Sequence, residues 1–385
     1  MMNRQNLTYW SALALMPGLS TRQKNAIYVR CYTAIPRIDI IELFENQEVW
    51  EQLQFTDAER SAFTAARENI ASTAFTTENL LAQGYKIIPF DAPEYSHALK
   101  ANLKQGAPTI LYTKGDISLM NTISTAVVGS RNADTTSLEF TRNIVSKAVA
   151  SERVIVSGYA KGVDRQAMDA CLDCGGKCII ILPQGITTFA SGFKQYYKRI
   201  LNGELLVVSS FPPQMPWSVS CAMARNSIIY GMANDIYVAQ SDDKGGTWAG
   251  VIDGLRKKRK IYVRNPLPNE KNANALLLQK GCIAVDMWGN TLTSYNYPMP
   301  TGQALDLVSE EATTYTSPED DILRVLSEYN DLTIKQIQTK AKLNISESKI
   351  RDILRKSDAV GCRKIRSTNH YYLHNKQDGL PNLDF

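Results

Sequence analysis

The sequence predicts an α/β protein built on a doubly wound, mostly parallel sheet, with a helical module at each end. Between about residues 81 and 288, short β-rich runs alternate with helical stretches. The runs are continuously apolar, which is typical of strands buried on both faces. The flanking segments have helical patterns instead. We therefore expect a helical module at residues 1–80 and a sheet domain at 81–288. A linker at 289–317, a second helical module at 318–376 and a tail at 377–385 follow.

The helical pattern of the first module includes the stretch LALMPGLSTRQKNAI, which predicts two helices joined by a turn at Pro17-Gly18. Such a turn can present backbone N–H groups to a phosphate. No basic cluster accompanies the turn, so we favour a plain helical hairpin.

The strands of the central domain are indicated by apolar runs of similar length. These runs are YKIIPF, TILYT, TAVVG, RVIVSG, KCIIIL, LLVVSSF, DIYVAQ and KIYVR. The helical stretches between them include residues 137–150, 164–174, 193–201, 226–232 and 247–257. Strands that alternate with helices form a sheet covered on both faces, and ligands bind at the carboxyl ends of such strands.

The last module has the pattern of a winged helix. The segment SPEDDILRVLSEYN predicts a capped helix, TIKQIQTKAKLNISESKIRDILRKSDAV predicts two more, and CRKIRSTNHYYLH alternates like a two-stranded wing. Residues 318–376 carry twelve Lys and Arg against eight Asp and Glu. Both DNA binding by the third helix and docking of a protein remain open.

Composition excludes several classes of protein. Hydrophobic content of 44% and charged content of 21% are those of a globular chain. No stretch approaches the roughly 18 apolar residues of a membrane span, and the run YWSALALMPGLS is too short for a signal peptide. We therefore expect a cytoplasmic protein with no membrane contact. The net charge of +5 suggests an acidic partner.

The seven cysteines are odd in number, and three of them cluster as Cys171, Cys174 and Cys178. Their spacing invites a metal or redox interpretation. No nearby histidine or fourth cysteine completes a tetrahedral set, so we expect all three to be small buried residues and predict no metal site.

Four strand exits carry glycine. They are Gly129-Ser130-Arg131, Ser157-Gly158-Tyr159-Ala160-Lys161-Gly162, Pro183-Gln184-Gly185 and Lys244-Gly245-Gly246-Thr247. Neither the dinucleotide fingerprint nor the Walker pattern is present, so no cofactor is predicted. Glycine turns before helices bind anions through backbone N–H groups and the helix dipole. Because Arg131 and Lys161 accompany two of them, we predict an anion site. Tight packing of strand on helix is the alternative for each glycine.

Several motifs in one order resemble the DNA-processing protein A (DprA, or Smf) family. They are VVGSRNA, VIVSGYAKGVDRQAMDACLDCGGKCIIIL, ARNSIIYGMANDIYVAQ and NANALLLQKGC, and the resemblance covers roughly residues 8–287. It implies a Rossmann-like central domain, an N-terminal module similar to SAM or helix–hairpin–helix domains, and a C-terminal winged helix. It also implies a dimeric, non-enzymatic protein that binds single-stranded DNA and hands it to a RecA-type recombinase.

The resemblance makes Arg131 the strongest candidate for a DNA contact, followed by a lysine in the helix after Gly185. The segment FKQYYKR there interleaves cations with Phe193, Tyr196 and Tyr197, which share one helical face and either pack in the core or stack on bases. The predicted DNA or phosphate contacts are Gly129, Ser130, Arg131, Ser157, Gly158, Lys161, Gly162, Lys194, Lys198, Arg199, Arg225, Asn226, Gly245, Gly246 and Thr247.

The chain departs from the family pattern at several places. Met168 stands where the family has histidine, the segment MARNS lacks one family arginine, and Arg264-Asn265-Pro266 replaces a Pro-Gly pair. A second basic run at residues 256–264 is at most auxiliary, because cations in a last turn also complement the helix dipole. These departures leave open a nucleotide- or DNA-sensing regulator, or an antitoxin-like partner protein, in phage defence.

Catalysis is the third alternative. Phosphoribohydrolases of related fold carry a glutamate after a glycine loop, but DDKGGTWAGVIDG has Ala249, Gly250 and Val251 there. The three histidines lie outside every glycine loop, and no Ser/His/Asp set is apparent. We therefore predict no catalytic residue.

Overall fold

The computed structural model divides into two compact units, Met1–Met299 and Pro300–Phe385. It describes residues 4–268, 270–293, 322–323, 325–326, 329, 331–341, 346–356, 360–365 and 368–373. Most of the predicted linker and the whole predicted tail lie outside the described residues. Each unit is described by itself below.

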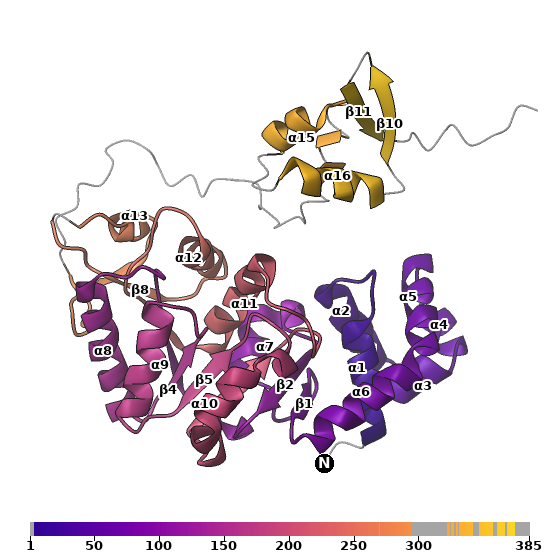
Figure 1. Cartoon of the computed structure of the whole chain (residues 1–385). Helices are drawn as coiled ribbons and strands as arrows, with labels where there is room; N and C mark the ends of the chain where they lie inside the picture. Colours follow the sequence, from indigo (N-terminus) through magenta and orange to yellow (C-terminus); the bar gives the residue numbers. More distant parts are fainter. Residues whose placement is uncertain are drawn as a thin grey trace, which may run out of the picture. The chain divides into compact units, whose positions relative to one another are not determined.

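A nine-stranded sheet forms the centre of the first unit (Figure 1). Its spatial order is β1(Lys86–Pro89), β2(Ile110–Lys114), β6(Leu205–Ser209), β5(Cys178–Ile181), β4(Val154–Ser157), β3(Ser124–Val128), β7(Asp235–Val238), β8(Ile261–Arg264) and β9(Ile283–Val285). Strand β2 pairs antiparallel with both β1 and β6, and the other neighbours are parallel. The predicted doubly wound, mostly parallel sheet is therefore confirmed. Strand β9 was not predicted, because three residues give no readable pattern.

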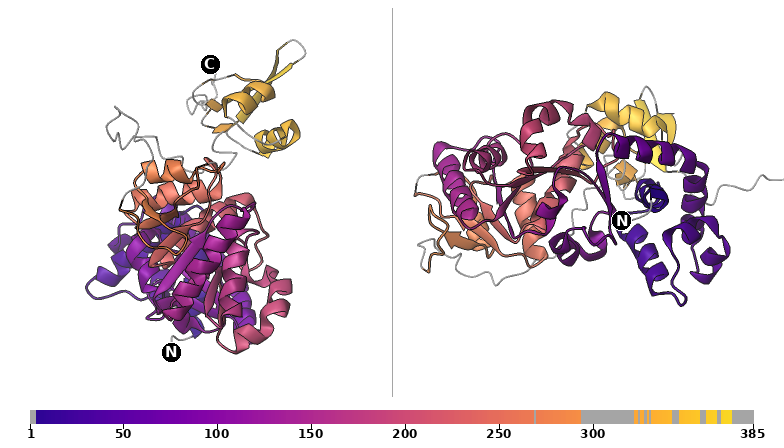
Figure 2. Two further views of the ribbon diagram at one scale, coloured as in Figure 1. Left: turned by 90° about the vertical axis from the view of Figure 1, so that its left-hand side faces the viewer. Right: turned by 90° about the horizontal axis from the view of Figure 1, so that it is seen from below.

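Strand order reverses at β3, since β4, β5 and β6 follow on one side of it and β7, β8 and β9 on the other. Right-handed crossovers then put the connecting helices on both faces. Helices α8(Thr135–Ala150), α9(Val163–Asp173) and α10(Ala190–Leu201) follow one another across one face (Figures 1 and 2). Helix α11(Val219–Met232) packs against α12(Gly246–Arg256) and α7(His97–Leu103). The reversal point at β3 is where a doubly wound fold binds its ligand.

Six helices precede the sheet in the same unit. They are α1(Arg4–Leu15), α2(Thr21–Thr33), α3(Ile40–Glu45), α4(Glu48–Gln52), α5(Asp57–Glu68) and α6(Ile70–Ala82). Helix α2 begins with a reciprocal cap between Ser20 and Gln23, which satisfies exposed N–H groups of its first turn. The buried Asn25 of α2 donates from Nδ2 to the carbonyls of Gln105 (2.8 Å) and Ala107 (2.7 Å). These hydrogen bonds join α2 to the segment before β2.

One hydrophobic core runs through these helices and the sheet. It includes Trp10, Leu13, Phe44, Phe63, Tyr95, Tyr112, Ile155 and Ile180. Among the described helices, none is long and apolar enough to cross a membrane.

The clustered cysteines only partly follow expectation. Cys171 and Cys178 are buried, and Cys171 donates from Sγ to the carbonyl of Lys177 at 3.3 Å. Cys174 is exposed, so the prediction that all three are buried is wrong at this position, which ends α9. In the part of the chain that the structure describes, no group of three or more His, Cys, Asp or Glu is arranged to hold a metal ion.

The second unit has its own small core. Helices α15(Ile334–Lys340) and α16(Glu347–Lys356) accompany an antiparallel hairpin of β10(Val360–Ile365) and β11(Thr368–Leu373). Its core contains Ile322, Leu326, Ile337, Ile350, Leu354 and Tyr371. Two helices and a hairpin agree with the predicted order of elements, and the winged-helix assignment stays a prediction.

A buried ion pair fixes the carboxyl ends of β7 and β8. Arg264, only 1% exposed, pairs its two terminal nitrogens with both carboxylate oxygens of Glu270 at 3.0 and 2.7 Å. It also donates to the carbonyl of Ala239 (3.0 Å) and to Ser137 Oγ (3.1 Å) in the first turn of α8. The charged guanidinium donates all four hydrogen bonds, which offset part of the free energy that burial of its charge costs. Arg264, one of the departures from the family pattern, therefore joins β8 to the end of β7 and to the start of α8 at the carboxyl edge of the sheet.

Replacing Arg264 by methionine is expected to leave Glu270 without its partner and to lower the free energy of unfolding by about 3–5 kcal/mol. Urea titration followed by circular dichroism measures the loss. The control is Lys257→Met, which removes a partly exposed pair with Asp253 on α12 and should cost at most about 0.5 kcal/mol. Equal midpoints for the two variants would contradict the role given to Arg264.

Candidate functional site

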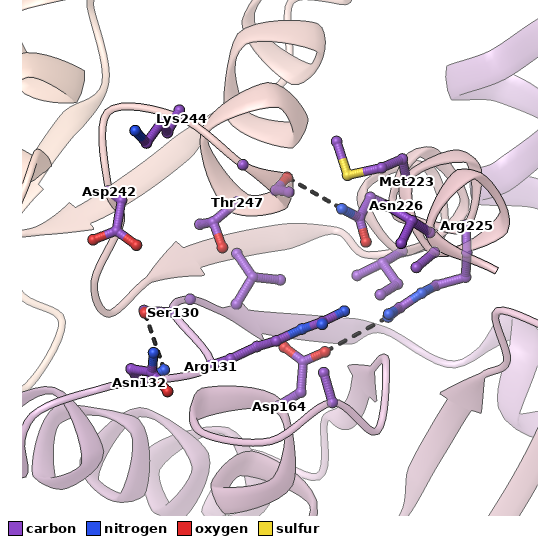
Figure 3. Close-up of a pocket in the computed structure, with 18 of the residues that line it drawn as sticks. Ser130, Arg131, Asn132, Asp164, Met223, Arg225, Asn226, Asp242, Lys244 and Thr247 are labelled. Atoms are coloured by element: carbon purple, nitrogen blue, oxygen red, sulfur yellow. Dashed lines mark hydrogen bonds and ion pairs between the residues drawn. The ribbon is translucent and has the colours of Figure 1, made fainter. Parts of the chain in front are cut away.

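Two adjoining cavities lie at the carboxyl ends of the strands. The larger, of about 360 Å³, is bounded by the loop after β3, the loop after β7 and helix α11 (Figure 3). The smaller, of about 270 Å³, is bounded by the loops after β4 and β5 and by Trp217. Arg131, Ala160 and Arg225 line both cavities. Together the cavities bring three of the four predicted glycine exits, and the start of the fourth, to one edge.

An ion pair between Asp164 of α9 and Arg225 of α11 lies where the two cavities adjoin (Figure 3). Arg225 Nη1 lies 3.6 Å from Asp164 Oδ2, with side-chain exposures of 4% and 11%. Burial raises the pKa of Asp164 and lowers that of Arg225, so desolvation outweighs their mutual attraction. The backbone N–H groups of Ala160 and Gly158 favour the charged form of the Asp164 carboxylate and so oppose the rise in its pKa. The pair determines where the loop after β4 lies.

Three predicted glycines are required by packing. A Cβ on Gly158 would lie 1.2 Å from Arg225 Nη1, and one on Gly129 would lie 2.6 Å from a methyl of Val163. Gly162 has φ +78°, and its Cβ would lie 2.3 Å from the carbonyl oxygen of Ser130. The packing alternative therefore accounts for all three. Gly245 differs, because it has φ +89° and nothing lies within 4 Å of its Cβ position.

Two of the helix N-termini at this edge differ in how they are capped. Helix α8 begins at Thr135, and Asp134 accepts the N–H of Ser137 at 2.7 Å. The cap thus occupies one of the N–H groups that the start of a helix can offer to an anion. Helix α12 follows Gly245, which provides no side-chain cap. Its first N–H groups therefore have no side-chain acceptor, and Gly246 and Thr247 of this turn line the larger cavity.

Positive charge is concentrated along the shared wall. Arg131 is exposed and lies close enough to Arg225 to lower the pKa of Arg225, in addition to the larger effect of burial. Lys244 lines the larger cavity together with two carboxylates, Asp164 and Asp242. The smaller cavity is lined by Arg131, Lys161 and Arg225, and no carboxylate is among the described residues that line it. The smaller cavity is therefore the more attractive to an anion.

Other predicted residues lie away from both cavities. Ser157 is buried and donates from Oγ to the carbonyl of Asp164 at 3.0 Å, so its role is structural. Lys194 and Lys198 are exposed on α10 and line neither cavity. Arg199 pairs with Glu204 at 2.6 Å beyond the C-terminal end of α10. These three cations of α10 are not gathered with Arg131.

Phe193, Tyr196 and Tyr197 all lie on α10, but the core covers only two of them. Tyr196 is buried and Phe193 packs against the core, whereas Tyr197 is 61% exposed. Adjacent helical residues are 100° apart, so the face of α10 that the sheet covers excludes Tyr197. Tyr196 is occupied by Arg165, whose Nη1 donates to its hydroxyl at 3.0 Å.

The remaining predicted residues lie together. Gly129, Ser130, Arg131, Arg225, Asn226, Gly245, Gly246 and Thr247 line the larger cavity, and Gly158 and Lys161 line the smaller. Asn226 donates from Nδ2 to the carbonyl of Gly246 at 3.1 Å, which ties α11 to the start of α12 (Figure 3). Sequence reasoning missed Trp217 and Phe189, because the loops that bring them to the smaller cavity have no periodic pattern.

Fold and site define a doubly wound α/β protein with a basic pair of cavities at its strand-reversal point. Residues 86–294, more than half of the 385-residue chain, match the family described as DNA recombination-mediator protein A. The chain belongs to this family.

Individual relatives are more distant. The chain is 32% identical over 157 residues to DNA processing protein DprA of Streptococcus pneumoniae, covering 40% of this chain and 55% of that protein. It is 26% identical over 189 residues to DprA of Bacillus subtilis, covering 47% and 60%. The chain thus spans little more than half the length of these relatives. The X-ray structure of the S. pneumoniae protein has the same fold, with a TM-score of 0.60 and 21% identity over 72% of this chain and 94% of that one.

Asp164→Asn is expected to lower the free energy of unfolding by about 3–5 kcal/mol, because Arg225 would remain buried without its counterion. Arg131→Met should change stability by less than about 0.5 kcal/mol, because Arg131 is exposed. Thermal unfolding of both variants beside the wild type separates the two roles. An early-melting Arg131→Met protein would show that Arg131, too, is structural.

Proposed function

We propose that this chain is a non-enzymatic, single-stranded DNA-binding protein that passes the strand to a RecA-type recombinase. The observation that carries the proposal is the smaller cavity, where the exposed Arg131 and Lys161 lie beside aromatic side chains, while Arg225 is paired with Asp164. Cationic tracks for phosphate and aromatic faces for bases are the two requirements for holding a single strand.

Phosphate binding would use groups that the fold leaves accessible. Arg131 supplies a rigid fork of donors, which suits phosphate oxygens better than a lysine would. Lys161 adds a second cation on the same side, and the uncapped start of α12 adds backbone donors in the larger cavity. A strand crossing the shared wall would thus meet cations in the smaller cavity and backbone N–H donors in the larger.

The further roles rest on membership of the family, whose description is that of a recombination mediator. We infer a homodimer that acts in the cytoplasm beside the recombinase, with the second unit contributing a contact to DNA or to protein. A non-enzymatic role agrees with the chemistry of the cavities. Among the described residues lining them there is no histidine or cysteine, and Asp164 is engaged by Arg225.

The second candidate is a regulator that senses a small nucleotide, of the kind used in phage defence. A volume of about 360 Å³ suits a small molecule, and the larger cavity combines apolar Ile229 and Val128 with polar Asn226 and Asn132. Calorimetric titration with mononucleotides would favour this function if a nucleotide bound and displaced single-stranded DNA.

Single-stranded oligonucleotide should bind more tightly than blunt duplex, with log K falling by roughly 0.7 per phosphate contact for each unit of log salt. Arg131→Ala should weaken binding of the single strand by about 1–3 kcal/mol, the range for hydrogen bonds to charged groups. Fluorescence anisotropy over a salt series measures both the salt dependence of the wild type and the loss of affinity in the variant. The matched control is Arg142→Ala, an exposed arginine of α8 that lines neither cavity. Equal losses in the two variants would reject Arg131 as the phosphate contact.

The purified protein should release no ribose phosphate from nucleoside monophosphates and no phosphate from nucleoside triphosphates. Asp242 is the carboxylate of the larger cavity that is not paired with Arg225. Hydrolysis that disappears in Asp242→Asn would overturn the non-enzymatic assignment, and chromatography of the reaction products is sufficient to detect it.

A further inference from the structure

Trp217 is an exposed aromatic side chain at the mouth of the smaller cavity. It is 49% exposed and lines the cavity together with Arg131 and Lys161. Tryptophan is highly buried on average, so the exposure of this indole beside two cations needs an explanation. Nothing in the family resemblance points to this residue, which lies in the segment PPQMPWSVS before α11.

The backbone on both sides of Trp217 is held in place. Gly185, in the loop after β5, donates its N–H to the carbonyl of Met215 at 2.8 Å, and Met215 donates to Pro212 at 2.9 Å. On the other side, Ser218 caps α11 by accepting the N–H of Cys221 at 3.1 Å. The exposed indole is therefore presented by a fixed segment, which lowers the entropy cost of using it in binding.

The other aromatic residues of this cavity are already engaged. Tyr159 and Phe189 meet edge to face at 5.1 Å, and the guanidinium of Arg165 lies 3.9 Å from the Tyr159 ring centre. Phe189 is also buried. Among the described residues, Trp217 takes part in none of the ring contacts of this wall. Its indole is thus the aromatic surface that the cavity offers to a ligand.

We propose that Trp217 stacks on an unpaired base of the bound strand while Arg131 and Lys161 hold the flanking phosphates. This inference rests on the proposed function and gives it a source of selectivity. Every base has a π-face, so stacking tolerates any sequence. In a duplex the same face is covered by neighbouring base pairs, so the indole favours single strands.

The experiment compares two ligands and four proteins. The ligands are a fluorescein-labelled oligothymidylate and an abasic strand with the same number of phosphates. The proteins are wild type, Trp217→Ala, Trp217→Phe and the control Trp288→Ala, which removes a 63% exposed tryptophan after β9 that lines neither cavity. Thermal unfolding of each variant confirms that the fold is kept.

Trp217→Ala should weaken oligothymidylate binding about tenfold and leave abasic-strand binding and the salt slope unchanged. Trp217→Phe should restore most of the loss, and Trp288→Ala should match the wild type. Equal losses on both strands, or wild-type affinity of Trp217→Ala for oligothymidylate, would overturn the stacking role. Wild-type protein that binds neither strand would instead overturn the proposed function itself, so the two failures are distinguishable.

Discussion

The edge that carries the cavities depends on one buried ion pair. The Asp164 carboxylate pairs with Arg225, and the Asp164 carbonyl accepts the Ser157 hydroxyl at the end of β4, so α9, α11 and β4 meet at this residue. Desolvation outweighs the attraction, which means that the pair does little for stability in comparison with an apolar pair. Its contribution is positional. It places the guanidinium beside Gly158, and Gly162 lacks the Cβ that would collide with the carbonyl oxygens of Ser130 and Arg131.

The distribution of charge matters more here than its total. A net charge of +5 over 385 residues is modest, yet Arg131, Lys161 and Arg225 gather around one cavity whose described lining residues include no acid. A cleft lined by one sign of charge concentrates the field and attracts the opposite charge from solution. The larger cavity, with Asp164 and Asp242 opposite its cations, has a more balanced field.

The sequence predicted eight of the nine strands of the sheet, because each of the eight is an apolar run between polar turns, whereas β9 is too short to show one. Helix α11 was predicted only from residue 226, whereas Ser218 caps it eight residues earlier, in a stretch without helical periodicity. The candidate site was predicted less well. Glycine at a strand exit indicates close approach without saying by what, and at Gly158 the neighbour is Arg225 itself. Trp217 was not predicted, because its position depends on the contact of Met215 with Gly185, thirty residues away.

The two cavities have a wall in common, and this has a thermodynamic consequence. Arg131 lines both, so a ligand that draws its guanidinium into one cavity withdraws it from the other. If two ligands both used this side chain, their binding would be linked, and such linkage is reciprocal: whatever factor one ligand imposed on the second, the second would impose on the first. Such coupling would need only a rearrangement of one exposed guanidinium, without any movement of the sheet.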